Sequence, residues 1–137
     1  MPESIREQVV QAFADRIGAA RADRIDSESD LPVRALWDPT ETTEKNKYGK
    51  YDCTVTVQVA ELAARDFSVN SSIQGNDMLS RLLDDALTTD HTLGGLCKGI
   101  SYTGSTLDFP AEGQKEMIVL ATFEVVYVIS NSNPYQQ

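Results

Sequence analysis

Residues 116–129 read Glu-Met-Ile-Val-Leu-Ala-Thr-Phe-Glu-Val-Val-Tyr-Val-Ile, and the rest of the chain is arranged around them. The odd-numbered positions are all apolar, whereas the even-numbered positions mix apolar residues with Glu116, Thr122 and Glu124. Because successive side chains of a strand point to opposite faces, this pattern predicts one long strand with a buried face. Burial of the large side chains on that face contributes on the order of 10 kcal/mol of gross driving force. We therefore expect this strand to lie centrally in a sheet.

Length and charge limit the possible functions. The 137 residues, 41% of them hydrophobic, suffice for one domain over residues 1–137 with a real core. The chain carries 21 acidic and 12 basic residues, a formal net charge of −9. Such a surface repels DNA phosphates, so it argues against nucleic-acid binding by charge neutralisation. It is compatible with a basic partner or with a channel wall along which DNA slides.

The N-terminal residues have no apolar signal core, and no run approaches the roughly 20 apolar residues of a membrane span. We expect a protein that is made in the cytoplasm and has no membrane contact.

Few residues suggest catalysis or metal binding. His91 is the only histidine, which rules out a cluster of histidine ligands, and its position fits an exposed turn after a helix. The glycines before Leu96 follow a predicted helix and precede a strand, the reverse of a phosphate-binding loop. Cys53 and Cys97 each lie in a predicted strand, where we expect reduced, buried thiols. We predict that the protein is not an enzyme and binds no cofactor or metal.

Two amphipathic helices are predicted. A capping box begins at Ser4, and apolar residues then recur every four positions, which predicts a helix over residues 4–21. A second capping box begins at Ser71, ahead of an i, i+3, i+4 pattern that predicts a helix over residues 72–88.

Three further strands are predicted from alternating apolar residues, over residues 31–37, 51–59 and 96–103, whereas residues 61–70 have no clear period. The element order is thus helix, two strands, helix, two strands. The expected fold is α+β: an antiparallel or mixed four-stranded sheet with both helices packed on one face. The second face of the last strand is also partly apolar, so it needs cover from the core or from another subunit.

Two polar loops, at residues 38–50 and 104–114, project from the predicted sheet, and a flexible tail follows at residues 131–137. The first loop is interpreted as a hairpin arm, and it holds the only basic cluster of an acidic chain. Exposed aromatic and charged side chains near such loops are candidates for docking, although the lysines fit a solvated loop equally well. The candidate interface residues are Trp37, Lys45, Lys47, Tyr48, Lys50, Phe109 and Tyr135.

Taken together, these segments resemble the tail terminator proteins of long-tailed bacteriophages over nearly the whole chain. Similar small virion proteins have the turn Thr-Leu-Gly-Gly-Leu, here residues 92–96, ahead of a strand. They also end in a long strand of the form Phe-Glu-Val-x-Tyr, here residues 123–127.

The resemblance implies a structural virion protein of the tail or neck, assembled in the host cytoplasm. Such a subunit closes into a ring, usually hexameric, at the head-proximal end of the tail. There it ends polymerisation of the tail tube protein and offers a joining surface to the head–tail connector protein, while DNA passes through the channel without specific binding.

Two other interpretations stay open. One is a head–tail connector, or neck, subunit of the same kind of virion, because head-completion and tail-completion proteins share these patterns. The other is a small enzyme or ligand-binding domain with a pocket between helix and sheet, which would need convergent polar groups. Mass measurement in solution separates the ring interpretations from the enzyme.

Overall fold

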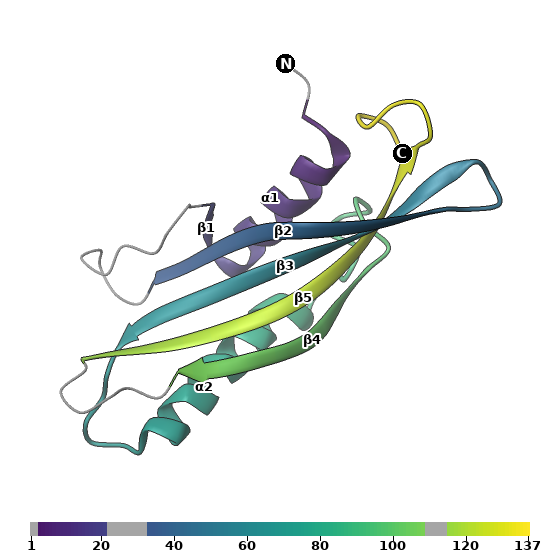
Figure 1. Ribbon diagram of the computed structural model, residues 1–137. Coiled ribbons are helices and arrows are strands. Elements are labelled where there is room, and N and C mark those ends of the chain that lie inside the picture. The colour runs from purple at the N-terminus through teal and green to yellow at the C-terminus, as the bar shows by residue number, and fades with distance from the viewer. Residues whose placement is uncertain (1–2, 22–32, 109–114) are drawn as a thin grey trace.

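The computed structural model of the chain describes residues 3–21, 33–108 and 115–137. Its fold is α+β, with two helices and a mixed sheet of five strands rather than the expected four (Figure 1). The elements in chain order are α1 (Ile5–Ile17), β1 (Ala20–Arg21), β2 (Val33–Lys45), β3 (Lys50–Ala64), α2 (Ser71–Leu87), β4 (Gly99–Asp108) and β5 (Glu116–Ser130).

The strands lie in the order β1-β2-β3-β5-β4. The two-residue strand β1 runs parallel to β2, and every other neighbouring pair is antiparallel. The stretch at 116–129 therefore forms an interior strand, as predicted, because β5 is hydrogen-bonded to β3 on one side and to β4 on the other. Its odd-numbered side chains from Met117 to Tyr127 are all buried.

Both helices cover the same face of the sheet, as predicted (Figure 1). The ring of Phe13 in α1 meets that of Phe123 in β5 edge to face, with centroids 5.2 Å apart, a favourable geometry for an aromatic pair. The residue that lets α2 approach the sheet is Gly75, because a Cβ there would lie 3.2 Å from Leu107 and 3.4 Å from Met117. One core thus joins α1, α2 and the helix-facing side of the sheet.

The first helix is shorter than predicted. It begins as expected at Ser4, whose hydroxyl accepts a hydrogen bond from the backbone N–H of Glu7. It ends at Ile17 rather than at residue 21, because Gly18 takes a left-handed conformation with φ of 67° and caps the last turn. The chain is then free to extend along β2 as β1.

The second helix is capped one residue earlier than predicted. Asn70, not Ser71, is the N-cap, and its side chain accepts the backbone N–H of Ser72. Gln74, three residues after Ser71 and so the second member of the predicted capping box, instead reaches back to the preceding loop. Its side chain accepts the N–H of Asp66 and donates to the carbonyl of Ala64.

The predicted loop at 38–50 is mostly strand, which corrects the expected strand ends. Residues 40–45 of β2 pair with residues 51–56 of β3. The pairing shifts register between Trp37 and Thr40, so β2 continues through Asp38 with a local irregularity. The segment is therefore a projecting hairpin, which agrees with the predicted hairpin arm (Figure 1). At its other end β3 continues to Ala64, into the segment without a clear period.

The predicted loop at 104–114 is also shorter than expected. Strand β4 continues to Asp108 after a register shift between Tyr102 and Gly104, and residues 109–114 lie outside the described part of the chain. The predicted strand start at residue 96 is wrong, because β4 begins at Gly99 and Cys97 lies in the turn before it.

The C-terminal segment at residues 131–137, expected to be flexible, folds back onto the domain. The carbonyl of Pro134 accepts the N–H of Ile5, and that of Gln136 accepts the N–H of Ser130. These bonds place the C-terminus beside the start of α1 and the end of β5 (Figure 1).

Candidate functional site

The hairpin arm ends in a turn that is fixed by its own side chains. The Asn46 side-chain oxygen accepts the backbone N–H groups of Tyr48 at 2.9 Å and Lys50 at 3.1 Å. Gly49 has φ of 76°, a conformation that a residue without a Cβ adopts at little cost. The turn thereby fixes the positions of Lys47 and Tyr48, both exposed, at the tip of the arm.

The turn between α2 and β4 is built around one carboxylate. Asp90 accepts hydrogen bonds from the hydroxyl and the N–H of Thr92 and from the N–H of Gly94. These bonds stabilise the ionised form and lower the pKa of Asp90 to about 2. Leu93 takes φ of 51°, unusual for a residue with a side chain, and is buried in the core. The turn is therefore stabilised by the hydrogen bonds of Asp90 at the surface and by the buried side chain of Leu93 in the core.

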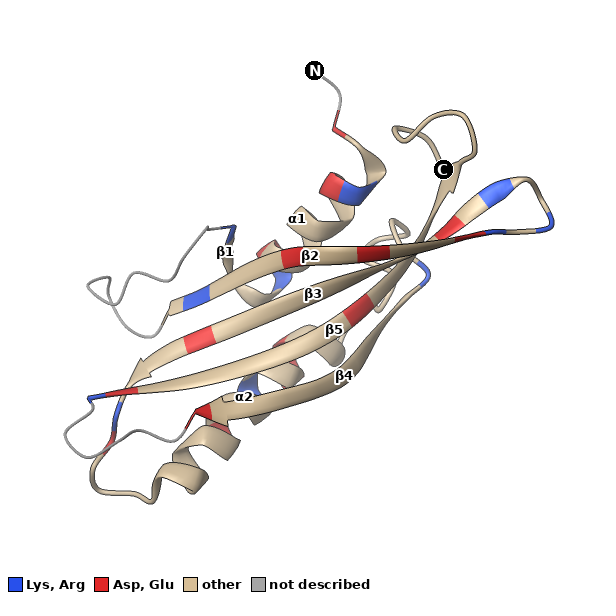
Figure 2. Ribbon diagram, viewed as in Figure 1, with Lys and Arg blue, Asp and Glu red and all other residues tan. Residues whose placement is uncertain are grey.

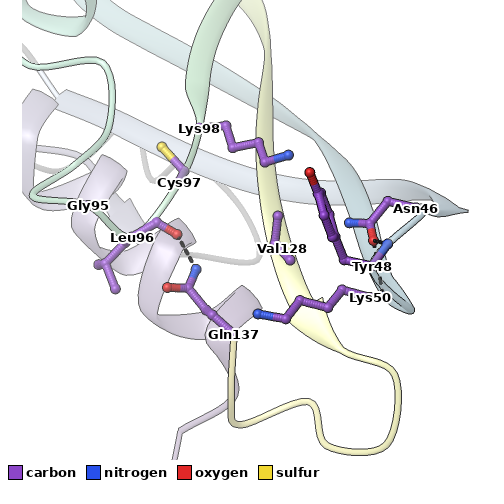
Figure 3. Close-up of a pocket in the computed structure, with 9 residues that line it drawn as sticks. All are labelled: Asn46, Tyr48, Lys50, Gly95, Leu96, Cys97, Lys98, Val128 and Gln137. Atoms are coloured by element: carbon purple, nitrogen blue, oxygen red, sulfur yellow. Dashed lines mark hydrogen bonds between the residues drawn. The ribbon is translucent and has the colours of Figure 1, made fainter.

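The arm and this turn come together to form a pocket of about 370 Å³ (Figure 3). The hairpin contributes Asn46, Tyr48 and Lys50, whereas the turn and the end of β5 complete the wall. The remaining lining residues are Gly95, Leu96, Cys97, Lys98, Val128 and Gln137. In Figure 3 the chains of Lys50 and Lys98 extend beside Tyr48 from two different segments.

Of the residues that the structure describes, two basic ones, Lys50 and Lys98, and no acidic one line the pocket. Figure 2 shows basic residues at the end of the hairpin arm. Lys98 makes an ion pair of 3.2 Å with Asp52, whereas Lys45, Lys47 and Lys50 form no ion pair with any described residue. The ammonium group of Lys47 lies 5.2 Å from the ring centre of Tyr48. Amino groups with an exposed tyrosine ring suit the docking of carboxylates on a flat partner surface.

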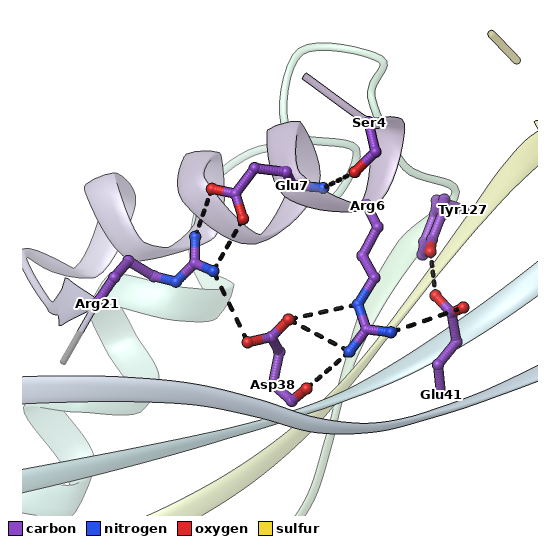
Figure 4. Close-up of polar contacts among 7 residues, drawn as sticks. All are labelled: Ser4, Arg6, Glu7, Arg21, Asp38, Glu41 and Tyr127. Carbon is purple, nitrogen blue, oxygen red and sulfur yellow. Dashed lines mark hydrogen bonds and ion pairs between the residues drawn. The ribbon is translucent and has the colours of Figure 1, made fainter. Parts of the chain in front are cut away.

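A partly exposed polar network fixes the base of the arm on the first helix (Figure 4). Arg6 of α1 donates to the carbonyl of Asp38 at 2.7 Å and lies 3.8 Å from the carboxylate of Glu41. Arg21 pairs with Glu7 at 2.8 Å and reaches Asp38 at 3.8 Å. The register shift in β2 is thus the point at which the arm is fastened to the helix layer.

Tyr127 completes this network from β5. Its hydroxyl donates to the carboxylate of Glu41, and burial, together with that hydrogen bond, raises the pKa of Tyr127 above its usual range. Burial likewise raises the pKa of Cys53 and of Cys97, both of which are free thiols. Raised pKa values keep these groups neutral, which suits packing rather than nucleophilic attack.

The remaining predicted site residues are spread over the molecule. Trp37 is half-buried on the sheet face away from the helices, and Tyr135 is exposed in the C-terminal segment. Phe109 lies outside the described residues. His91 is exposed after α2, as predicted, and one ring nitrogen lies 2.6 Å from the carbonyl of Leu87. The structure thus gathers Tyr48 and Lys50 into the pocket and leaves Trp37 and Tyr135 apart from it.

The pocket also includes residues that were not singled out as interface candidates. The sequence of the turn at residues 95–98 does not show that it meets the arm, because that contact depends on β5 lying between β3 and β4. Gln137 reaches the pocket because its side chain donates to the carbonyl of Leu96 at 2.6 Å. The only local signal for these residues was Lys98, a basic residue beside a glycine turn.

Within the described residues, no group of three or more potential ligands is placed to hold a metal ion, and neither helix is long and apolar enough to cross a membrane. No protein-family model matches the chain, and no curated protein matches it significantly.

Proposed function

We propose that this chain is a structural virion protein that forms a ring on the head-proximal end of a phage tail tube. In that position it ends polymerisation of the tube and offers a joining surface to the head–tail connector. The proposal places the protein in the tail or neck of the virion, with the tail tube protein and the connector as partners.

One observation carries this proposal: two separate sequence features meet at one exposed end of the domain. The turn at residues 92–96, which bears the resemblance to tail terminators, lies against the basic hairpin arm and shares a pocket with it. The other part of the resemblance, residues 123–127, lies in the interior strand β5. The residues that carry the resemblance therefore lie in the core of the domain and beside the basic arm.

A ring of identical subunits needs a head-to-tail contact, in which two different patches of each subunit meet. The arm supplies one such patch, because it projects beyond the helix-covered part of the sheet (Figure 1). The net charge of −9 suits the wall of a channel through which DNA must pass without being held.

The test is a phage in which the gene for this chain is inactivated, with the tails then measured by electron microscopy. We expect tails of uncontrolled length that are not joined to heads, and supply of the wild-type chain should restore their normal length. Free tails of normal length would instead indicate a head–tail connector subunit. Normal, infectious particles would show that the chain is not a virion assembly protein.

A further inference from the structure

A second surface lies at the end of β3 opposite to the arm. There a groove of about 420 Å³ runs between the end of the strand, the following loop and the first turns of α2. Three of its lining residues are acidic and one is basic. The lining residues are Glu61, Ala63, Asp66, Val69, Ile73, Gln74, Asp77, Met78 and Arg81.

The groove is bordered by unusually exposed apolar side chains. In the described part of the chain, six large hydrophobic or aromatic residues are exposed, and three of them lie here: Phe67 at 71%, Ile73 at 62% and Val69 at 38%. Clustered exposure of this kind marks interaction surfaces, whereas single exposed apolar residues are ordinary. The most exposed of the other three is Tyr48, at 75%, on the tip of the arm.

The two surfaces are complementary in charge. The tip presents Lys45, Lys47 and Lys50, none of which is in an ion pair with a described residue. Of the groove carboxylates, Glu61 is buried and paired with Arg34, Asp77 is paired with Arg81, and Asp66 forms no ion pair with a described residue. Asp66 is held ionised by hydrogen bonds from Ser68. The rim ion pair of Asp77 with Arg81 is highly exposed, so it is weak and easily exchanged.

The two surfaces cannot meet within one subunit. Lys50 begins β3, and Ala63, which lines the groove, lies next to the end of that strand. At about 3.3 Å per residue the two ends of the strand are roughly 45 Å apart. Figure 1 shows the arm and the start of α2 at opposite ends of the sheet. Contact between these surfaces therefore requires a second copy of the chain.

We propose that the tip of the arm in one copy docks into the groove at the start of α2 in the next copy. Tyr48 lies against Val69 and Ile73, and the lysines beside it meet the exposed carboxylates of Asp66 and Asp77. This contact is head-to-tail, so repetition closes a ring or extends a filament. The inference rests on the proposed ring and identifies which two surfaces build it.

Charge-exchanged variants test the contact. The tip variant carries Lys47→Glu and Lys50→Glu, and the groove variant carries Ile73→Lys and Asp77→Lys; all four side chains are exposed, so folding should persist. We expect each variant alone to remain monomeric in native mass spectrometry. An equimolar mixture should recover rings, because a native tip then meets a native groove and a reversed tip meets a reversed groove.

A matched control makes the same change in net charge at positions of α2 that lie outside the groove. Ser80→Lys with Asp84→Lys adds as much positive charge as the groove variant at two exposed positions that do not line it. This control should form rings like the wild type. Circular dichroism of each variant checks that the monomer is folded.

The outcomes separate this contact from the ring itself. Rings from the tip variant or the groove variant alone, or no recovery on mixing, would overturn the docking of tip into groove while the wild-type ring stands. A wild-type chain that stays monomeric, both alone and on tail tubes, would overturn the contact and the proposed function together.

Discussion

Two single side chains, Asp90 and Arg34, each hold several parts of the chain together. Asp90 organises an exposed turn by accepting three hydrogen bonds from Thr92 and Gly94. Arg34 joins elements that are far apart in the sequence, because it links β2 to β3 through Glu61, to α2 through Asp85 and to the end of α1 through the carbonyl of Ile17. The role of Asp90 could have been predicted, because an aspartate in a turn commonly accepts the N–H of the residue two positions on. The role of Arg34 could not, because its partners Glu61 and Asp85 are 27 and 51 residues away in the sequence.

Acid should weaken the Asp90 turn. The pKa of Asp90 is about 2 in the folded chain and near 3.9 in an unfolded one, so the folded state binds fewer protons. Its contribution to stability is therefore complete above about pH 4 and is lost as the pH falls toward 2. When the free energy of unfolding is measured with urea at several pH values, it should fall less between pH 4 and pH 2 for Asp90→Asn than for the wild type. Asp84→Asn, an exposed carboxylate on α2, is the control and should follow the wild type; identical curves for wild type and Asp90→Asn would contradict this role.

Arg34 should be among the most costly charged residues to remove. Its guanidinium lies 2.5 Å from Glu61 and 2.7 Å from both Asp85 and the carbonyl of Ile17. Glu61 is 7% exposed, so Arg34→Ala leaves a buried carboxylate without its partner. We expect a loss of about 3 kcal/mol in the free energy of unfolding, measured with urea.

The exposed pair of Arg81 with Asp77 provides the comparison for Arg34. Arg81→Ala should cost less than about 1 kcal/mol, because that ion pair is open to solvent. The double variant Arg34→Met with Glu61→Met should recover most of the stability, since it buries no unpaired charge. If Arg34→Ala and Arg81→Ala lowered the free energy of unfolding equally, burial of the Arg34–Glu61 ion pair would not determine its contribution to stability.

At the scale of elements, local periodicity predicted β5, the core of β3 and both helices, because each pattern depends only on neighbouring residues. It failed at the ends of the strands. Residues 40–45 are polar and residues 104–108 are mostly polar, so neither segment has a clear apolar alternation. Both nevertheless form strands, because their backbone groups pair with β3 and β5. The end of α1 could have been predicted from Gly18, since glycine commonly ends helices.

Close packing of α2 on the sheet predicts the effect of a larger residue at Gly75. Gly75→Val should cost about 1–3 kcal/mol, because its side chain would push against Leu107 and Met117. Gly104→Val in β4 is the matched control, since a Cβ there meets no atom within 4 Å and the stability should change by less than about 0.5 kcal/mol. Thermal unfolding of both variants measures the difference. Equal stability for the two would show that α2 does not depend on this close approach.

At the scale of the molecule, the order of the strands brings together the residues of the pocket and of the groove, and local sequence patterns could not predict these contacts. The lysines of the arm were predicted as docking candidates, but their meeting with Lys98 and Gln137 depends on the order of the strands and on the folded-back C-terminus. The groove at the start of α2 had no signal, because its residues come from a segment without clear period and from the outer side of a helix. The two surfaces lie at opposite ends of one long strand, so they are two different patches, as a head-to-tail contact requires.

The ring is tested most directly by native mass spectrometry of the full chain at micromolar concentration, alone and with isolated tail tubes. The account predicts a single closed oligomer, with six copies if the resemblance to tail terminators extends to the ring size, either free or released from the tube ends. A chain that stays strictly monomeric under both conditions, without associating with tubes, would contradict it.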